Sequence, residues 1–165
     1  MKYLERFANV AVIVAVVVLL GVILRGDFGR RPVPAPPMQS LVGKTVSLPG
    51  VQFPKDRSSL LLVVSTSCHF CKDSLPFYKQ LTEAARGKLG VIAVLPQSQT
   101  EAQAFLQSAG VETSQIVSAS PDKVGARGTP TLLLVGKNGA IEHAWLGKLD
   151  VKGEQEVLSL VAPKS

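Results

Sequence analysis

The chain's two cysteines, Cys68 and Cys71, stand three positions apart between segments of different periodicity. Residues 60–65 form a short apolar run rich in β-branched side chains, which is typical of a buried strand. After the cysteines, apolar residues recur at helical spacing: Leu75, Tyr78, Leu81 and Ala85. The sequence therefore predicts that a strand ends and a helix begins at the cysteines, with Cys68 at the helix N-terminus.

This position favours a chemical role for the cysteine pair. Unpaired backbone N–H groups at a helix N-terminus stabilise a thiolate, and Cys71, one turn further, is placed to attack a mixed disulfide at Cys68. Two alternatives stay open. A structural disulfide over so short a loop adds little chain-entropy stabilisation. A zinc site needs two more ligands, for which the chain offers His69, His143 and scattered acids. The strand-to-helix context favours redox chemistry, which needs no organic cofactor and no metal.

The remaining apolar patterns alternate between strand and helix. Residues 91–95 predict a second buried strand and 116–117 a third, while the segment after Gln99 has helical spacing that closes at Gly110. An Asn-Gly turn predicts a hairpin of residues 131–135 and 140–146, before a last helix with Val157, Leu158 and Val161 on its packed face. We therefore expect an α/β fold, a mixed sheet with helices on both faces.

Pro130 stands directly before the predicted strand 131–135. Proline donates no hydrogen bond to a sheet, so it belongs at the start of a strand or in a turn. Both isomers of the Thr129-Pro130 bond are compatible with this position, since cis bonds occur in about 5–6% of X-Pro peptides in folded proteins. The sequence alone does not choose between them.

The N-terminal part has a different composition. Residues 8–24 carry no charge, and as a helix they would reach about 25 Å, the short end of a bilayer span. We expect an uncleaved membrane anchor within residues 1–31; the alternatives are a cleaved signal peptide and a buried core helix. Basic residues flank the segment on both sides, so the charges leave its orientation open. Four prolines in residues 32–39 predict a semi-rigid linker to one domain, residues 40–165.

The net charge of +6 does not indicate a nucleic-acid partner. Half of the excess flanks the apolar segment, where five basic residues outnumber two acids: Lys2, Arg6, Arg25, Arg30 and Arg31 against Glu5 and Asp27. The rest is spread along the chain and forms no basic stripe that could follow a phosphate backbone. With 46% apolar residues, the chain is also not a disordered protein.

Two motifs together resemble a thioredoxin fold. The first is Ser67-Cys68-His69-Phe70-Cys71-Lys72, with Pro76 five residues after the second cysteine, and the second is the stretch from Gly125 to Gly139 that contains Thr129-Pro130-Thr131. The segment 42–48 and the extra strand and helix before Pro130 are similar to the TlpA/ResA-type branch, membrane-anchored thiol–disulfide oxidoreductases outside the cytoplasmic membrane. The resemblance covers roughly residues 40–160.

The resemblance implies a role for each matching residue. Cys68 would be the attacking thiol and Cys71 the resolving thiol of a redox-active disulfide, beside a substrate-binding loop formed by Thr129 and a cis Pro130. His69 and Phe70 would tune the thiol, with a partly protonated His69 stabilising the Cys68 thiolate. Pro76 would kink the first helix. Two positions depart from the cytoplasmic thioredoxins: Ser67 replaces a tryptophan, and Leu62 replaces a buried acid.

The resemblance also implies partners and a location. We expect protein clients with thiols or disulfides, a membrane electron donor or acceptor, and a reductase or maturation role rather than an oxidase role. The chain would cross the bacterial inner membrane once, through residues 8–24, with its soluble domain facing the periplasm or the cell exterior. The alternative from another class is a copper-delivery module on the same fold, although that branch typically spaces its cysteines by three residues.

Overall fold

The computed structural model describes residues 12–18, 21, 40–51 and 53–162. The chain divides into two compact units, Met1–Pro37 and Met38–Ser165. Residues 12–18 of the first unit are helical. Most of the expected span 8–24 and nearly all of the expected linker 32–39 lie outside the described residues. Within the described residues, no helix has both the length and the apolar character needed to cross a membrane.

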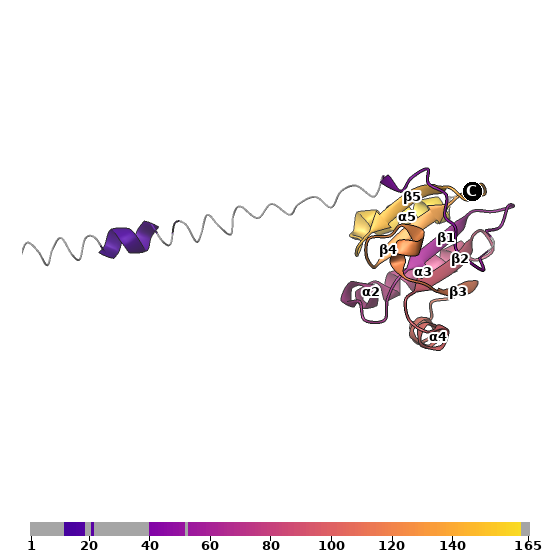
Figure 1. Cartoon of the computed structure of the whole chain (residues 1–165), viewed down its shortest axis with the longest axis horizontal. Coiled ribbons are helices and arrows are strands. Elements are labelled where there is room, and N and C mark those ends of the chain that lie inside the picture. Colours follow the sequence, from indigo (N-terminus) through magenta and orange to yellow (C-terminus); the bar gives the residue numbers. More distant parts are fainter. Residues whose placement is uncertain (1–11, 19–20, 22–39, 52, 163–165) are drawn as a thin grey trace, which may run out of the picture. The chain divides into compact units, whose positions relative to one another are not determined.

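The second unit is built on a five-stranded mixed sheet in the order β3-β2-β1-β4-β5 (Figure 1). The strands are β1 Ser59–Val63, β2 Gly90–Leu95, β3 Gln115–Ser118, β4 Thr131–Val135 and β5 Ile141–Leu146. β1, β2 and β3 are parallel, whereas β4 is antiparallel to both β1 and β5. The predicted strands and the mixed sheet are therefore confirmed, including the hairpin that closes it.

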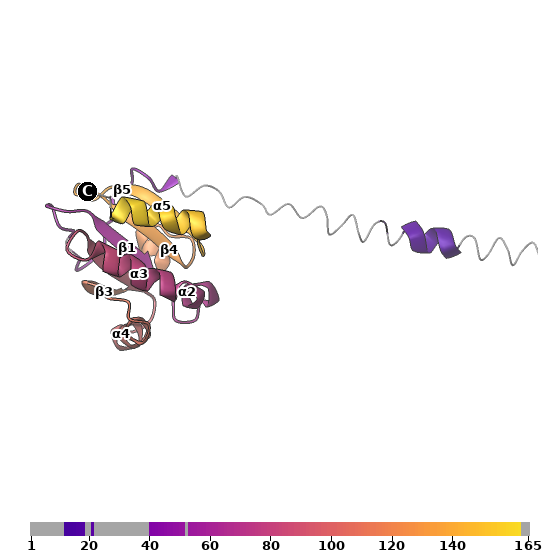
Figure 2. The same cartoon turned by 180° about the vertical axis from the view of Figure 1, so that it is seen from behind.

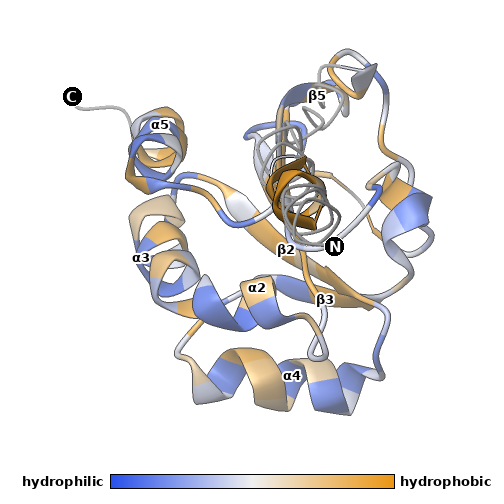
Figure 3. Ribbon diagram, turned by 90° about the vertical axis from the view of Figure 1, so that its left-hand side faces the viewer, coloured by the Kyte–Doolittle hydropathy of each residue, from blue (hydrophilic) through white to orange (hydrophobic). Residues whose placement is uncertain are grey.

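Three α-helices cover one face of this sheet: α3 Leu75–Ala85, α4 Gln99–Ser108 and α5 Val151–Val161. The chain steps in the same direction from β1 to β2 and from β2 to β3, so right-handed crossovers place α3 and α4 on the same side. One core cluster joins Leu60 and Leu62 of β1 to buried side chains of all three helices. Figure 2 shows α3 and α5 side by side over the strands. Figure 3 shows the three helices from another side, with α3 and α5 viewed along their axes.

We expected helices on both faces of the sheet, but no α-helix packs on the opposite face within the described residues. Leu61 and Val63 alternate along β1 with Leu60 and Leu62 and point to this second face. They belong to a cluster with three residues of an irregular N-terminal segment, Leu41, Val46 and Leu48. Among the described residues, no α-helix contributes to this cluster, and the short 3-10 helix η2, Pro121–Val124, supplies Val124. Gly125, with φ of 75°, ends η2 in a left-handed conformation after four residues. The connection between β3 and β4 therefore forms no α-helix.

The expected kinked first helix is two helices, α2 His69–Asp73 and α3. Pro76 has no N–H to donate to the Lys72 carbonyl, which interrupts the helical hydrogen bonds between them. Ser74 ends α2 by donating its amide to the carbonyls of Phe70 and Cys71. It also accepts from the Tyr78 amide at 3.0 Å, where α3 begins. The chain therefore has a break between two helices where we predicted a kink in one. α2 is a separate five-residue helix that has Cys68 as its N-cap and contains Cys71.

We expect Leu61→Ala to lower the free energy of unfolding by about 2–5 kcal/mol, because Leu61 is fully buried and the face it packs on has no α-helix to close over a cavity. Leu160→Ala is the matched control, since Leu160 is 37% exposed and its loss should cost less than about 0.5 kcal/mol. Urea denaturation measures both variants. Equal effects would show that the irregular N-terminal segment does not bury Leu61.

Candidate functional site

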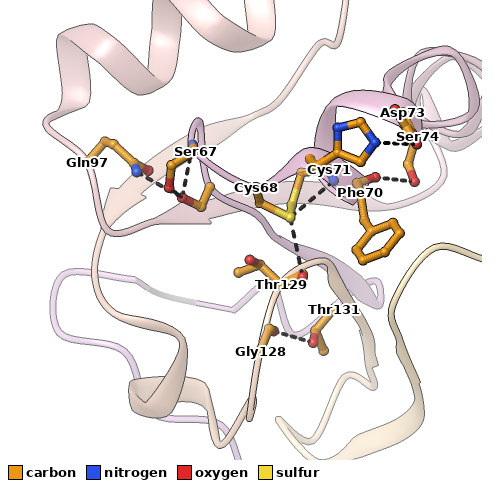
Figure 4. Close-up of a disulfide and its surroundings, with 12 residues drawn as sticks. Ser67, Cys68, Phe70, Cys71, Asp73, Ser74, Gln97, Gly128, Thr129 and Thr131 are labelled. Atoms are coloured by element: carbon orange, nitrogen blue, oxygen red, sulfur yellow. Dashed lines mark hydrogen bonds and ion pairs between the residues drawn. A yellow bond between two sulfur atoms is a disulfide. The ribbon is translucent and has the colours of Figure 1, made fainter. Parts of the chain in front are cut away.

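Cys68 and Cys71 form a disulfide at the carboxyl end of β1 (Figure 4). Cys68 is the N-cap residue of α2 and is half-buried, whereas Cys71 lies inside α2 and is fully buried. Their Cα atoms are 5.2 Å apart. The structure thus places Cys68 at the start of the helix, as the sequence predicted, and makes it the cysteine that solvent and partners can reach.

The Cys68 sulfur has a hydrogen-bond donor of its own. The Cys71 amide donates to Cys68 Sγ at 3.1 Å, which is the N-cap bond of α2. In the reduced protein the same amide would point at a Cys68 thiolate and stabilise its charge. This contact comes from the backbone and does not depend on the residues between the two cysteines.

The Thr129 carbonyl oxygen is the second neighbour of this sulfur, at 3.3 Å from Cys68 Sγ. The disulfide sulfur carries no proton, but a reduced Cys68 thiol can donate to this oxygen. The two neighbours therefore act in opposite senses, because the amide favours the thiolate and the carbonyl favours the thiol. The Thr129-Pro130 peptide bond is cis, and Gly147 holds the loop by donating its amide to the Pro130 carbonyl at 2.7 Å.

Cys71 lies in an apolar environment. It belongs to the core cluster of Leu60, Leu62 and Val64, and the only hydroxyl among that cluster's buried members is that of Tyr78. Burial raises the pKa of Tyr78 to about 12, so its phenol is protonated at neutral pH. Apolar surroundings disfavour a thiolate at Cys71. Leu62 of β1 belongs to the same cluster and contributes to these surroundings.

His69 makes no hydrogen bond to the Cys68 sulfur in the described structure. Its Nε2 lies 3.5 Å from Asp73 Oδ2, and its side chain is 81% exposed. Asp73 Oδ2 also accepts from Lys148 Nζ at 3.2 Å, which links α2 to the loop between β5 and α5. Phe70 is exposed and meets the His69 ring edge-on. With the two cysteines oxidised, His69 is thus paired with Asp73 along the helix, and tuning of the Cys68 thiolate by His69 stays a prediction.

A polar cluster next to Cys68 was missed in the sequence. Gln97 donates from Nε2 to Ser65 Oγ at 2.9 Å, and the hydroxyls of Ser65 and Ser67 are 3.0 Å apart. The Ser65 carbonyl accepts from the Cys68 amide at 3.2 Å, so this cluster holds the turn that presents Cys68. The sequence could have indicated this cluster, because Ser65 and Gln97 each come shortly after a predicted parallel strand. The carboxyl ends of parallel strands meet at one edge of the sheet, which brings the two side chains together.

Metal-ligating groups do not gather in the described part of the chain. No set of three or more His, Cys, Asp or Glu residues among residues 12–18, 21, 40–51 and 53–162 is placed to hold a metal ion. His143, the second histidine considered for a metal, stacks on Trp145 in β5 with ring centroids 5.5 Å apart.

The arrangement has counterparts among solved structures. A thiol:disulfide interchange protein, DsbE from Chlorobium tepidum, is similar with a TM-score of 0.57 at 20% identity, over 73% of this chain and 99% of that one. A thiol-disulfide isomerase from Corynebacterium glutamicum has a TM-score of 0.54 at 15% identity, over 80% and 99%. StoA from Bacillus subtilis has a TM-score of 0.51 at 18% identity, over 70% and 93%.

These similarities define the fold. No protein-family model matches the chain, and no curated protein sequence matches it. At 15–20% identity, the solved structures share an architecture with this chain. The second unit has a thioredoxin-like fold, with the Cys68–Cys71 pair where β1 meets α2.

We expect Asp73→Asn to release the His69 imidazole from its partner on α2. A ring free to turn toward Cys68 would stabilise the thiolate and make the reduction potential less negative, by about 20 mV for an interaction of about 1 kcal/mol. Equilibration in glutathione buffers measures this potential.

The double variant His69→Ala/Asp73→Asn is the control, because removing the Asp73 charge favours a thiolate even without His69. We expect the double variant to lose most of the shift. A shift that the double variant retains in full would show that Asp73 acts by charge alone and that His69 does not tune the thiol.

Proposed function

We propose that this chain is a thiol–disulfide oxidoreductase that exchanges disulfides with protein clients through Cys68 and Cys71. The observation that carries the proposal is the asymmetry of the pair. Cys68 is half-buried, receives the Cys71 amide and lies against the Thr129 carbonyl, whereas Cys71 is fully buried one turn away. An accessible attacking sulfur with a sheltered resolving sulfur is what two-step exchange requires. Proteins of similar fold carry the names thiol-disulfide isomerase and thiol:disulfide interchange protein, which supports the same chemistry here.

Reduction of a client proceeds in two balanced steps. The Cys68 thiolate attacks one sulfur of a client disulfide, so a Cys68–client bond forms and the other client sulfur leaves as a thiolate that is protonated from water. Cys71 then gives its proton to solvent and attacks Cys68 Sγ, which forms the Cys68–Cys71 disulfide and releases the second client thiolate. Two electrons pass from the dithiol to the client. The dithiol is the whole redox centre, so this reaction uses no organic cofactor.

Two exposed apolar side chains lie on segments next to the cysteine pair and the Thr129-Pro130 loop, and they would contact the client. Phe70, within the motif, is 57% exposed, and Leu146, at the end of β5, is 36% exposed. Leu146 adjoins Gly128, where an added Cβ would lie 3.8 Å from Leu146 Cδ1. Partly unfolded clients present apolar segments near their cysteines, and burying such segments here would hold the client disulfide at Cys68. Thr129 and Pro130 would form the wall of this client-binding loop.

We further propose that the domain works as a reductase or maturation factor on the outer side of the bacterial inner membrane. The apolar segment 8–24 would anchor it in the bilayer as a single span, and the proline-rich linker would hold the domain away from the surface. A reductase in an oxidising compartment must be returned to the dithiol state after each cycle. A membrane electron donor is therefore the second partner that this role requires.

We expect Cys71→Ser to accumulate mixed disulfides with clients, because the resolving thiol is gone while Cys68 still attacks. Non-reducing electrophoresis after acid trapping would show bands that collapse on reduction. Cys68→Ser is the matched control and should accumulate none, since Cys71 is fully buried. Mixed disulfides on Cys71 in place of Cys68 would reverse the assignment of the two thiols.

We expect reporter fusions at the C-terminus to be active outside the cytoplasm, because disulfide exchange with secreted clients places residues 32–165 there. Alkaline phosphatase, which needs an oxidising compartment, should be active, and a fluorescent reporter that matures only in the cytoplasm should be dark. A variant lacking residues 1–31 should reverse both signals. A cytoplasmic signal from the full chain would reject this orientation.

A further inference from the structure

A basic pocket lies on the face of the sheet away from α3, α4 and α5. Its volume is about 230 Å³, and it lies between the N-terminal segment and η2. Its floor is apolar and buried, formed by Leu41, Val46, Val124 and Ile141. Its rim carries the exposed basic residues Lys44, from the N-terminal segment, and Lys123 and Arg127, from the connection between β3 and β4.

Within the described residues, the lining of this basic pocket carries positive charges and no negative charge. No acidic residue lines it, and none of its three basic side chains takes part in an ion pair of the described chain. Outside this lining, a hydrogen bond with Ser120 is the largest cause that lowers the pKa of the Asp122 carboxyl, and the charge of the neighbouring Lys123 lowers this pKa further. Like charges gathered around an apolar floor create a positive potential that a ligand with both acidic and apolar groups would complement.

The basic pocket is connected to the cysteine pair through one short loop. Arg127 on its rim precedes Thr129 by two residues, which limits the distance between their Cα atoms to about 8 Å. The Thr129 carbonyl lies 3.3 Å from Cys68 Sγ. A client held at Cys68 in extended form, at about 3.3 Å per residue, would bring residues a few positions from its cysteine to the rim.

We propose that the basic pocket is a docking site for an acidic segment of the protein client, close in sequence to the cysteine that Cys68 attacks. Client carboxylates would pair with Lys44, Lys123 and Arg127, and apolar client residues would cover the floor. This inference rests on the proposed exchange function, and it assigns a preference for acidic clients to a surface outside the Cys68–Cys71 pair.

Binding can be measured apart from redox chemistry with a thiol-free peptide. The probe is a fluorescein-labelled peptide of alternating glutamate and leucine, mixed with the full chain in non-ionic detergent. The control is the same peptide with glutamine in place of every glutamate. We expect the acidic peptide to bind at least fivefold more tightly by anisotropy, and we expect 0.5 M salt to remove the difference.

Two triple variants with the same change in net charge locate the site. Lys44→Glu/Lys123→Glu/Arg127→Glu should abolish the preference, whereas Lys55→Glu/Lys88→Glu/Lys137→Glu, at exposed lysines outside the pocket, should keep it. Circular dichroism confirms that both variants are folded. Equal loss in both variants would overturn the site, because net charge alone would then explain binding.

A kinetic comparison separates this inference from the proposed function. Two peptide disulfides, one flanked by glutamates and one by glutamines, are reduced by the dithiol form of the full chain. We expect the second-order rate constant of this single-turnover reduction to be at least fivefold higher for the glutamate peptide, and this ratio to fall below twofold in the pocket variant. Equal rates for both peptides would overturn the docking site and leave the exchange function intact. No reduction of either peptide would overturn the exchange function itself.

Discussion

Val63 of β1 lies opposite Thr131 of β4 in the antiparallel pair at the centre of the sheet. Because the two strands run in opposite directions, the residues that follow Val63 and the residues that precede Thr131 leave the sheet at the same end. Cys68 comes five positions after Val63, and Thr129 comes two before Thr131, so this register brings their atoms within 3.3 Å. A slip of one residue would turn the side chains of β4 to the opposite face of the sheet and separate the loop from the sulfur.

The burial of β1 and β4 fixes this register. All residues of both strands are buried, and their alternate side chains belong to two separate clusters, one under the α-helices and one under the N-terminal segment. Short-range hydrogen bonds at the site add to the pairing of β1 and β4. The Ser65 carbonyl holds the turn before α2, the Cys71 amide reaches the Cys68 sulfur, and the Pro130 carbonyl is held by Gly147. Folding and chemistry thus depend on the same central strand.

Several features could be predicted because they rest on local pattern. The run 60–65 and the Asn138-Gly139 turn indicated β1 and the β4–β5 hairpin. The change from a strand-like run to helical spacing indicated that the cysteines lie at a helix start. His69 was expected to stabilise the Cys68 thiolate, and its i,i+4 spacing to Asp73 also favours the pair along the helix that the structure contains. This rule could have been applied without a structure.

Other features depend on contacts between distant segments. The N-terminal segment covers the second face through an isolated bridge between Thr45 and Ala140 and through Leu41, Val46 and Leu48, none of which shows a regular period in the sequence. The basic pocket likewise combines three basic residues that are up to 83 positions apart, Lys44, Lys123 and Arg127. Such sites become visible only when the topology places their segments together.

The central claim is that Cys68 and Cys71 form a reversible redox pair, and its potential tests this directly. The full chain is equilibrated in glutathione buffers of known potential, and its free thiols are alkylated and counted by mass. We predict one two-electron transition between dithiol and disulfide, at a potential above about −300 mV, where exchange-active pairs lie. A pair that stays oxidised to potentials below about −300 mV would behave as a structural disulfide and contradict the account.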